Sequence, residues 1–366
     1  MAFAWKEHKD IWKGEGIYFL TFTVAGRQKL LGSLIPISDS RSYQRNVQRS
    51  EDTDDKSSAK YTSTQATVKL TPLGFAVSQE LHNLPSRVDG IMVCAKQVMP
   101  DHIHAVVWVR KDTGRSIRQI GNGFRIGIKR KAIELCVWNE DAGHILDIPY
   151  IRTLSHKGQL KSMINYVHAN PDNAWMRHLT PSLYTIRRNI QLAGLSFDGM
   201  GKERLLAYPD RQVIALSRSL SLPQIDEAVS RALSNAERGA VTYTAAINEG
   251  EKAVSKAVRT NGYPLVIIML DGFPQEGTDA ARYFHPNGIY HKVCGEGRLM
   301  LLSPHQSNYQ NPTLIQLTDL ELERKAQEKG QLYTPILHSS KRWRMIAGNI
   351  MLKMIAGENL FAGTNT

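Results

Sequence analysis

The pattern of apolar residues changes near residue 205, and this change restricts the fold of the chain more than any other feature. Before it, strand-like segments rich in aromatic and β-branched residues, such as GIYFLTFTV at 16–24, are separated by helical segments. After it, short continuous apolar strands alternate with helices, which is typical of a parallel sheet. We therefore predict two domains: an antiparallel α+β domain over 1–195 and an α/β domain with a parallel sheet over 205–366.

The first domain is expected to contain a hairpin, because Pro100-Asp101 marks a tight turn between strands at 87–98 and 102–109. The polar segment 38–67 predicts a long, flexible insertion. The remaining elements are predicted from helix start signals, apolar spacing and proline: a helix at 72–84 capped by Thr71, a helix at 116–137 interrupted by Gly121, Gly123 and Gly127, a strand at 145–151, and a helix at 157–170 that Pro171 ends.

In the second domain, strands and helices are expected to alternate along the chain. Its predicted strands are 212–216, 240–243, 265–270 and 299–302. Its predicted helices are 222–234 and 249–260, with a closing helix at 343–361.

Several classes of protein are excluded by simple features. The apolar run Leu265–Leu270 has six residues, whereas a membrane-spanning helix needs about 20. The N-terminus lacks the apolar core of a secretory signal. The three cysteines, Cys94, Cys136 and Cys294, form no CxxC pair, which favours a reducing compartment and argues against a thiolate zinc site. We therefore expect a cytoplasmic protein, associated with the nucleoid if it binds DNA.

Positive charge is concentrated in the first part of the chain. The whole chain has a net charge of +12, and residues 1–200 hold 27 Lys+Arg against 18 Asp+Glu, a net +9. This excess favours a polyanionic partner, nucleic acid first, although such runs also occur as ordinary solvated helix faces. The candidate phosphate contacts are Arg115, Arg118, Arg125, Lys129, Arg130 and Lys131, with Lys157 and Lys161 further along. Trp108 and Trp138 could stack on bases, but core packing is the commoner role of tryptophan.

Two short motifs carry candidate chemistry. His102 and His104 lie at i and i+2 of a predicted strand, so both imidazoles point to one face and could bind one divalent cation. Tyr166 and Asn170 lie at i and i+4 of a predicted helix, so the Asn170 amide oxygen could complete a metal shell beside the Tyr166 hydroxyl. Each pair also has an ordinary structural interpretation: surface histidines on a strand, and a core tyrosine near a helix end. His168 faces elsewhere on the helix and is the weaker ligand candidate.

Together, MPDHIH at 99–104 and YVHANP at 166–171 resemble the motifs of the HUH single-tyrosine transposases, and those of the REP-associated tyrosine transposases in particular. The resemblance covers about residues 10–195 and includes the opening strand. Asp101 stands where the family usually has Asn, and the 38–67 insertion departs from the compact family domain.

The resemblance implies a ferredoxin-like sheet that carries the histidines on a central strand, with the tyrosine on a helix laid across it. It implies that His102, His104 and Asn170 hold Mg²⁺ or Mn²⁺ and that Tyr166 attacks a DNA phosphate, with Lys157 or Lys161 favouring the phenolate. The products would be a 5′-phosphotyrosine and a free 3′-OH, and the substrate single-stranded or hairpin DNA. The alternative is a non-catalytic, domesticated transposase that only binds hairpin DNA. The sequence leaves open whether the chain acts alone or as a homodimer.

The second domain resembles the Rossmann-like fold of DNA-processing protein A (Smf-like), through ALSRSLSLPQ at 215–224 and PLVIIMLDGF at 264–273. The resemblance implies phosphate contacts by Ser217, Arg218 and Ser221 at a helix N-terminus, with 248–251 as a second candidate loop. No GxGxxG is present, which argues against a dinucleotide. Glu251 and Lys252 are interpreted as surface charge. The alternatives are a structural or DNA-docking module, or a nucleotide- or RNA-processing enzyme driven by this domain.

Overall fold

The computed structural model describes residues 15–37, 65–269, 272–286, 288–338 and 340–357. The chain forms two compact units, which meet in the sequence at Leu179 and Thr180. This division comes earlier than the boundary expected between 195 and 205. The reason is that strands β7 (Arg187–Leu192) and β8 (Leu195–Gly201) are hydrogen-bonded into the sheet of the second unit.

The first unit contains a four-stranded antiparallel sheet with the order β4-β5-β1-β6. Its strands are β1 (Gly16–Thr23), β4 (Ile91–Val98), β5 (His102–Val109) and β6 (Tyr150–Thr153). The predicted hairpin is confirmed as β4 and β5, and the predicted antiparallel α+β layer is confirmed with it. The last strand begins later than expected: Leu146 makes only an isolated bridge with Val24, and regular pairing starts after Pro149, which has no N–H to donate.

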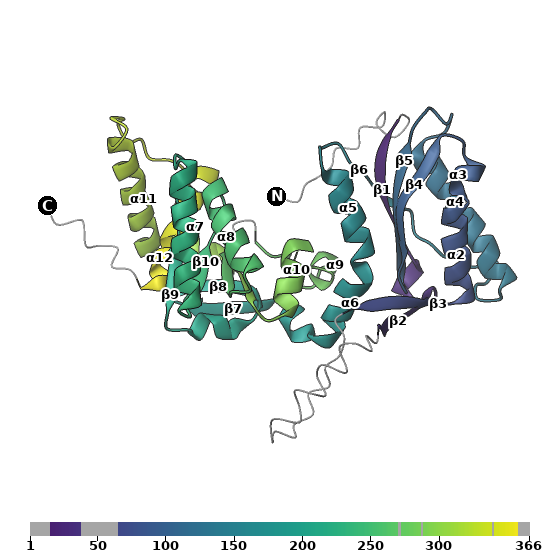
Figure 1. Cartoon of the computed structure of the whole chain (residues 1–366), viewed down its shortest axis with the longest axis horizontal. Coiled ribbons are helices and arrows are strands. Elements are labelled where there is room, and N and C mark those ends of the chain that lie inside the picture. The colour runs from purple at the N-terminus through teal and green to yellow at the C-terminus, as the bar shows by residue number, and fades with distance from the viewer. Residues whose placement is uncertain (1–14, 38–64, 270–271, 287, 339, 358–366) are drawn as a thin grey trace, which may run out of the picture. The chain divides into compact units, whose positions relative to one another are not determined.

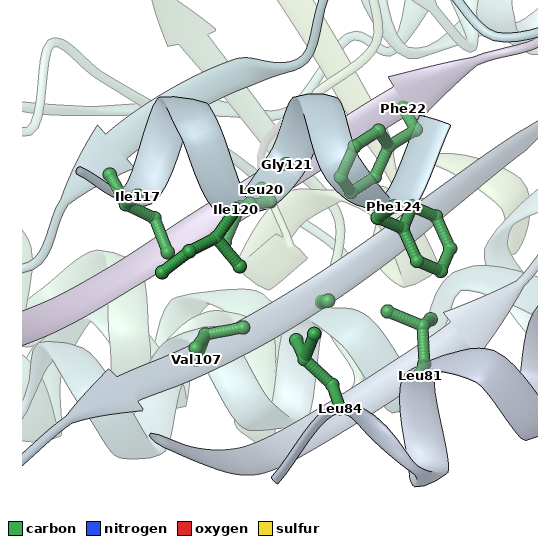
Figure 2. Close-up of a pocket in the computed structure, with 10 residues that line it drawn as sticks. Leu20, Phe22, Leu81, Leu84, Val107, Ile117, Ile120, Gly121 and Phe124 are labelled. Atoms are coloured by element: carbon green, nitrogen blue, oxygen red, sulfur yellow. The ribbon is translucent and has the colours of Figure 1, made fainter. Parts of the chain in front are cut away.

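Helices α2 (Pro72–His82) and α4 (Ile117–Glu134) cover one face of this sheet (Figure 1), and the short α3 (Leu84–Arg87) follows α2. The side chains of Tyr18, Leu20 and Phe22 point from β1 into the core between them. Figure 2 shows a small apolar gap in this core, where Ile117, Ile120 and Phe124 of α4 face Val107, Leu81 and Leu84. All the residues that line it are apolar, so the gap is part of the packing of the core.

Helix α5 (Gln159–His168) lies on the opposite face of the sheet, as Figure 1 shows. Its Val167 is fully buried against Phe19 of β1, Ala95 of β4 and Val106 of β5. The alternation of side chains along β1 and β5 therefore sends one set of residues to α2 and α4 and the other set to α5.

Two expectations about these helices need correction. The three glycines do not interrupt α4, which is one continuous helix capped by Ser116. Pro171 does not end a helix that reaches Asn170, because α5 ends at His168 and α6 (Asn170–Leu179) begins almost at once. Proline is tolerated in the first turn of a helix, where its missing N–H would have no intrahelical acceptor.

A two-stranded antiparallel ribbon, β2 (Gly32–Pro36) with β3 (Ala66–Leu70), completes the first unit after a short 3-10 turn at Ala25–Arg27. It contacts α6, and Asp172 of α6 accepts a hydrogen bond from the backbone N–H of Ala66. Residues 38–64, which form most of the predicted insertion, lie outside the described residues, while 66 and 67 belong to β3.

The second unit has a six-stranded mixed sheet with the order β7-β8-β12-β11-β10-β9. Strands β9 (Arg211–Ile214), β10 (Val241–Thr244), β11 (Leu265–Ile268) and β12 (Leu299–Pro304) are parallel, as predicted. Strand β8 joins β12 in the antiparallel direction, and β7 pairs with β8 at the edge. The four parallel strands follow one another in chain order, so they contain no reversal of the kind at which doubly wound sheets bind ligands.

Helices cover both faces of this second sheet (Figure 1). On one face lie α7 (Leu222–Glu237), α8 (Glu249–Thr260) and α10 (Gly288–Gly295), and on the other α11 (Pro312–Gln327) and α12 (Lys341–Ala356). The predicted helix at 249–260 is confirmed, and the closing helix is confirmed over a shorter range. The remaining short elements are α9 (Asp279–Arg282) and the 3-10 turns Pro181–Tyr184, Glu203–Ala207 and Gln306–Gln310.

Among the described residues, no helix combines the length and apolar character that crossing a membrane requires.

Candidate functional site

The candidate site lies on the α5 face of the first sheet. Ile103 and Ala105 of β5 point into the core beneath α2 and α4, so His102 and His104 point to the opposite face. Thr21 of β1 is paired with His104 on one side and with Tyr150 of the edge strand β6 on the other. The register therefore aligns Tyr150, Thr21 and His104 in one row across the sheet.

The structure brings both predicted histidines together with the predicted tyrosine. The ring centroids of His102 and His104 are 4.8 Å apart, and those of His104 and Tyr166 are 5.5 Å apart. Phe19 stacks on His104 at 5.1 Å and meets Tyr166 edge-on at 5.9 Å. These contacts join residues of β1, β5 and α5, and Tyr166 remains only partly buried. Phe19 thus supports both the imidazole and the phenol from below.

The Nδ1 atom of each imidazole is engaged by a neighbouring side chain. Nδ1 of His104 lies 2.9 Å from Oγ1 of Thr21. Nδ1 of His102 lies 2.7 Å from Oδ1 of Asp101, whose Oδ2 accepts a hydrogen bond from Arg27 at 3.3 Å. Partners of this kind set the orientation of metal-binding histidines and direct Nε2 toward the ligand. Thr21, Asp101 and Arg27 were not identified from the sequence, and only the adjacency of Asp101 to His102 could have signalled one of them.

The environment of Asp101 favours its charged form. Burial acts to raise the pKa of the Asp101 carboxyl, but the hydrogen bond from His102 and the charges of His102 and Arg27 outweigh it. The pKa therefore lies below its ordinary value.

Asn170, the predicted third ligand, is buried at the start of α6. Its amide nitrogen donates to the backbone carbonyl of Tyr166 at 3.0 Å, so it satisfies one of the last carbonyls of α5. This contact ties Asn170 to the backbone of the tyrosine, and the Oδ1 atom is the group that could serve a cation.

The donor set suits a divalent cation, because two adjacent imidazoles with engaged Nδ1 atoms can both bind through Nε2. Within the part of the chain that the structure describes, no three His, Cys, Asp or Glu side chains gather as a metal site. A third protein ligand would therefore be an oxygen from another kind of group, and the amide oxygen of Asn170 is the predicted candidate.

The predicted phosphate contacts lie on α4, or just before it in the case of Arg115, and so away from this face, because α4 covers the other side of the sheet. Arg125 is buried, and its guanidinium donates to the carbonyl of Leu146 and to Asn122. Burial lowers the pKa of Arg125, partly offset by the charge of Asp147. Lys129 donates to the carbonyls of Glu140 and Ala142. The remaining four, Arg115, Arg118, Arg130 and Lys131, are exposed.

Two predicted cations and one predicted aromatic residue belong to the α5 side. Lys157 precedes α5, Lys161 lies in its first turn, and both are exposed. Trp108 of β5 points to the same sheet face as His104 and is 39% exposed. Trp138 instead packs against the core of the opposite face and donates its indole N–H to the carbonyl of Gly143.

The predicted phosphate loop of the second unit is placed at the N-terminus of α7. Ser217, Arg218 and Ser221 are all exposed there, and Ser221 is the N-cap residue of α7. The interpretation of Glu251 as surface charge is wrong, because its side chain is 1% exposed. It accepts hydrogen bonds from the backbone N–H groups of Leu216 and Ile247 and from the Asn248 side chain. Glu251 thereby fastens the loops after β9 and β10 to each other.

Comparison with known proteins gives little similarity. No family model matches the chain, and no curated protein matches it. Among solved structures, a REP-associated tyrosine transposase bound to a REP hairpin aligns with 13% sequence identity and a TM-score of 0.26. The alignment covers 44% of this chain and 68% of that chain. This likeness is too weak to place the chain in a family.

Proposed function

We propose that the first unit is an HUH-type domain that cuts and rejoins single-stranded or hairpin DNA, with Tyr166 as the nucleophile. The observation that carries this proposal is the meeting of His102, His104 and Tyr166, whose rings lie 4.8 Å and 5.5 Å apart although α5 follows β5 by about 50 residues in the chain. Two imidazoles beside one partly exposed phenol provide a cation site and a nucleophile within reach of the same phosphate.

The strand order supports a ferredoxin-like layer. The chain forms two strand–helix–strand units, β1-α2-β4 and β5-α4-β6. In each unit the two strands run parallel and are separated in the sheet by one antiparallel strand, and both helices lie on one face. This is the split β-α-β arrangement. It leaves the other face open for α5, and β5 with its two histidines is a central strand.

In the proposed reaction, His102 and His104 would hold Mg²⁺ or Mn²⁺ through Nε2, with the Oδ1 atom of Asn170 as the third protein ligand. Such an ion would supply Lewis-acid polarisation of the scissile phosphate. The Tyr166 oxygen attacks phosphorus as its proton leaves to solvent, and the bond from phosphorus to O3′ breaks. The strand ends as a 5′-phosphotyrosine on Tyr166 and a free 3′-OH. Attack by a 3′-OH on the phosphotyrosine restores the phosphodiester and releases the tyrosine.

The surroundings of the site suit a single strand. Tyr150 is 54% exposed in the same row as His104 and offers a ring on which a base can stack. Lys157 and Lys161 provide positive charge at the start of the helix that carries Tyr166. The exposed Arg115, Arg118, Arg130 and Lys131 lie on the opposite side of the sheet. We therefore assign them to the flanking stem of a hairpin and not to the scissile phosphate.

For the second unit we propose a Rossmann-like DNA-docking module in which Ser217, Arg218 and Ser221 contact backbone phosphates. The supporting observation is their common exposure at the N-terminus of α7, where backbone N–H groups favour an anion. Arg218→Ala should weaken DNA binding by the full chain without changing the yield of covalent adduct at saturating DNA. If Arg218→Ala binds DNA as tightly as the wild type, the result would favour a structural role for this unit.

The decisive experiment tests for covalent chemistry. The full chain is incubated with labelled hairpin DNA and Mn²⁺, and SDS-resistant protein–DNA adducts are separated on a gel. The wild type should form an adduct, and Tyr166→Phe should bind the DNA but form none. Tyr150→Phe is the matched control, because it removes a phenol from the same sheet face.

Two results would contradict the proposal. An adduct that persists in Tyr166→Phe and disappears in Tyr150→Phe would make Tyr150 the nucleophile. Binding of hairpin DNA with no adduct under any metal condition would favour the binding-only alternative.

A further inference from the structure

We infer that Asp101 and Arg27 are positioning residues for His102, which they hold in the tautomer and orientation required to bind a cation. This inference rests on the proposed metal site, although its principal test does not require a metal. Neither residue has a role in the motif from which the site was predicted.

The hydrogen bonds at Asp101 determine which nitrogen of His102 carries the proton. A carboxylate only accepts hydrogen bonds. The Nδ1 atom of His102, 2.7 Å from Oδ1 of Asp101, is therefore a protonated nitrogen, and in the neutral ring, the form that binds a cation, Nε2 carries the lone pair. The other carboxylate oxygen, Oδ2, accepts from Arg27 at 3.3 Å. Contacts at both oxygens prevent the carboxylate from rotating, so the imidazole plane is fixed with it.

The backbone around Asp101 is held from several sides. The carbonyl of Asp101 accepts from the N–H of Val24 at 2.9 Å, and the carbonyl of Pro100 accepts from the N–H of Leu31 at 3.0 Å. The N–H of Met99 donates to the carbonyl of His102 at 2.8 Å and closes the hairpin turn. The carboxylate is thus presented from a rigid turn and not from a mobile loop.

Arg27 reaches Asp101 from an unusual backbone conformation. Its φ is +56°, in the left-handed region that few residues other than glycine adopt, and Gly26 before it has φ +62°. The N–H of Arg27 donates to the carbonyl of Val24 at 2.8 Å, so this tight turn directly follows β1. The turn returns the arginine to the hairpin end on which Asp101 and His102 lie.

Without the Asp101 carboxylate, the His102 ring should be free to rotate and to adopt either neutral tautomer. Partners of metal-binding histidines typically contribute about 10- to 100-fold to metal affinity. We therefore expect Asp101→Ala to weaken Mn²⁺ binding by about this factor while the fold persists. Arg27→Ala should have a smaller effect in the same direction, because it removes only the restraint on Oδ2.

The first test is the tautomer of His102 in the metal-free full chain, read from the ¹⁵N shifts of its ring. The wild type should show the Nδ1–H tautomer, and Asp101→Ala should shift the ring toward Nε2–H or a mixture. A wild-type His102 in the Nε2–H form would overturn the inference, whether or not the protein binds metal.

The second test is the affinity for Mn²⁺ alone, measured by titration calorimetry without DNA. Asp89→Asn is the matched control, since Asp89 is an exposed carboxylate paired with Lys111, and it should bind Mn²⁺ like the wild type. Equal affinities of wild type and Asp101→Ala would contradict the positioning role. If the wild type binds no Mn²⁺ but His102 shows the expected tautomer, the proposed metal site fails and the role of Asp101 stands.

Discussion

The Thr21 hydroxyl oxygen lies 2.9 Å from Nδ1 of His104, on the strand that also pairs with the edge of the sheet. Thr21→Val keeps the shape of the side chain but removes this partner. We expect about a tenfold loss of Mn²⁺ affinity, because the His104 ring loses its restraint. Thr21→Ser should restore the affinity, and titration calorimetry measures each change.

The matched control for this substitution is Thr23→Val. Thr23 lies opposite His102 on the same face, but His102 is engaged by Asp101. An equal loss of affinity in both variants would show that the β-branched hydroxyls act only through strand packing.

Tyr150 is predicted to bind a base without taking part in the chemistry. Its ring is 54% exposed beside Thr21. Tyr150→Ala should weaken binding of single-stranded DNA by about 1–3 kcal/mol, or about 5- to 150-fold, as for other stacking residues. Fluorescence anisotropy with a labelled oligonucleotide measures this loss, and Tyr150→Phe should retain most of the affinity. Equal binding by the alanine and phenylalanine variants would show that the DNA does not cross this edge.

Gly123 of α4 and Gly74 of α2 should respond in opposite directions to substitution by alanine. A Cβ at Gly123 would meet open space, so Gly123→Ala should stabilise the first unit by up to about 1 kcal/mol through helix propensity. A Cβ at Gly74 would lie 1.8 Å from the carbonyl oxygen of Leu31, so Gly74→Ala should destabilise it by at least about 2 kcal/mol. Urea unfolding of the full chain, followed by circular dichroism, compares them. Similar effects of the two substitutions would contradict the packing of α2 against Leu31.

Glu251 should be essential to the stability of the second unit. Glu251→Gln replaces one acceptor oxygen by an NH₂ group that faces existing N–H donors, which should cost about 1–3 kcal/mol. Glu249→Gln is the control, because Glu249 is an exposed neighbour paired with Lys252. If the two variants unfold at the same urea concentration, the carboxylate does not hold the loops together.

The cysteines should differ sharply in reactivity. Burial raises the pKa of the Cys294 thiol to about 12, and its S–H donates to the carbonyl of Leu183. Because the thiolate is the reactive form, native Cys294 should resist alkylation at pH 8, whereas the exposed Cys136 should react within minutes. Peptide mass spectrometry after iodoacetamide treatment, with and without denaturant, distinguishes the two. Rapid native modification of Cys294 would show that its surroundings open to solvent.

Local signals predicted those elements whose boundaries are set by their own residues. Thr71 and Pro72 start α2, and the alternation of 102–109 forms β5 as expected. The predicted strand at 145–151 begins too early because Ile145 and Leu146 are apolar like strand residues, whereas in the structure both are buried before β6 starts at Tyr150. The sequence does not predict that β7 and β8 belong to the second sheet, because β8 joins it by pairing with β12, about 100 positions away, and β7 joins it only through β8.

The same distinction applies to the candidate site. His102, His104 and Tyr166 were identified because each has a local motif, and the structure brings them together. Thr21 and Arg27 have no such signal: they come from β1 and the turn after it, 83 and 74 positions from the residues they contact. Arg125 was assigned to DNA because charge alone does not show that its guanidinium is buried.

The two imidazoles belong to a strand hydrogen-bonded on both sides, whereas the phenol belongs to a ten-residue helix packed on the sheet through apolar side chains. In the proposed site, the two imidazoles and the phenol are therefore held by different parts of the unit. Substitutions beneath α5 at Ala95 or Val106, which pack against Val167, should displace the phenol more than the imidazoles. Phe19 contacts both His104 and Tyr166, so a substitution there should disturb both rings.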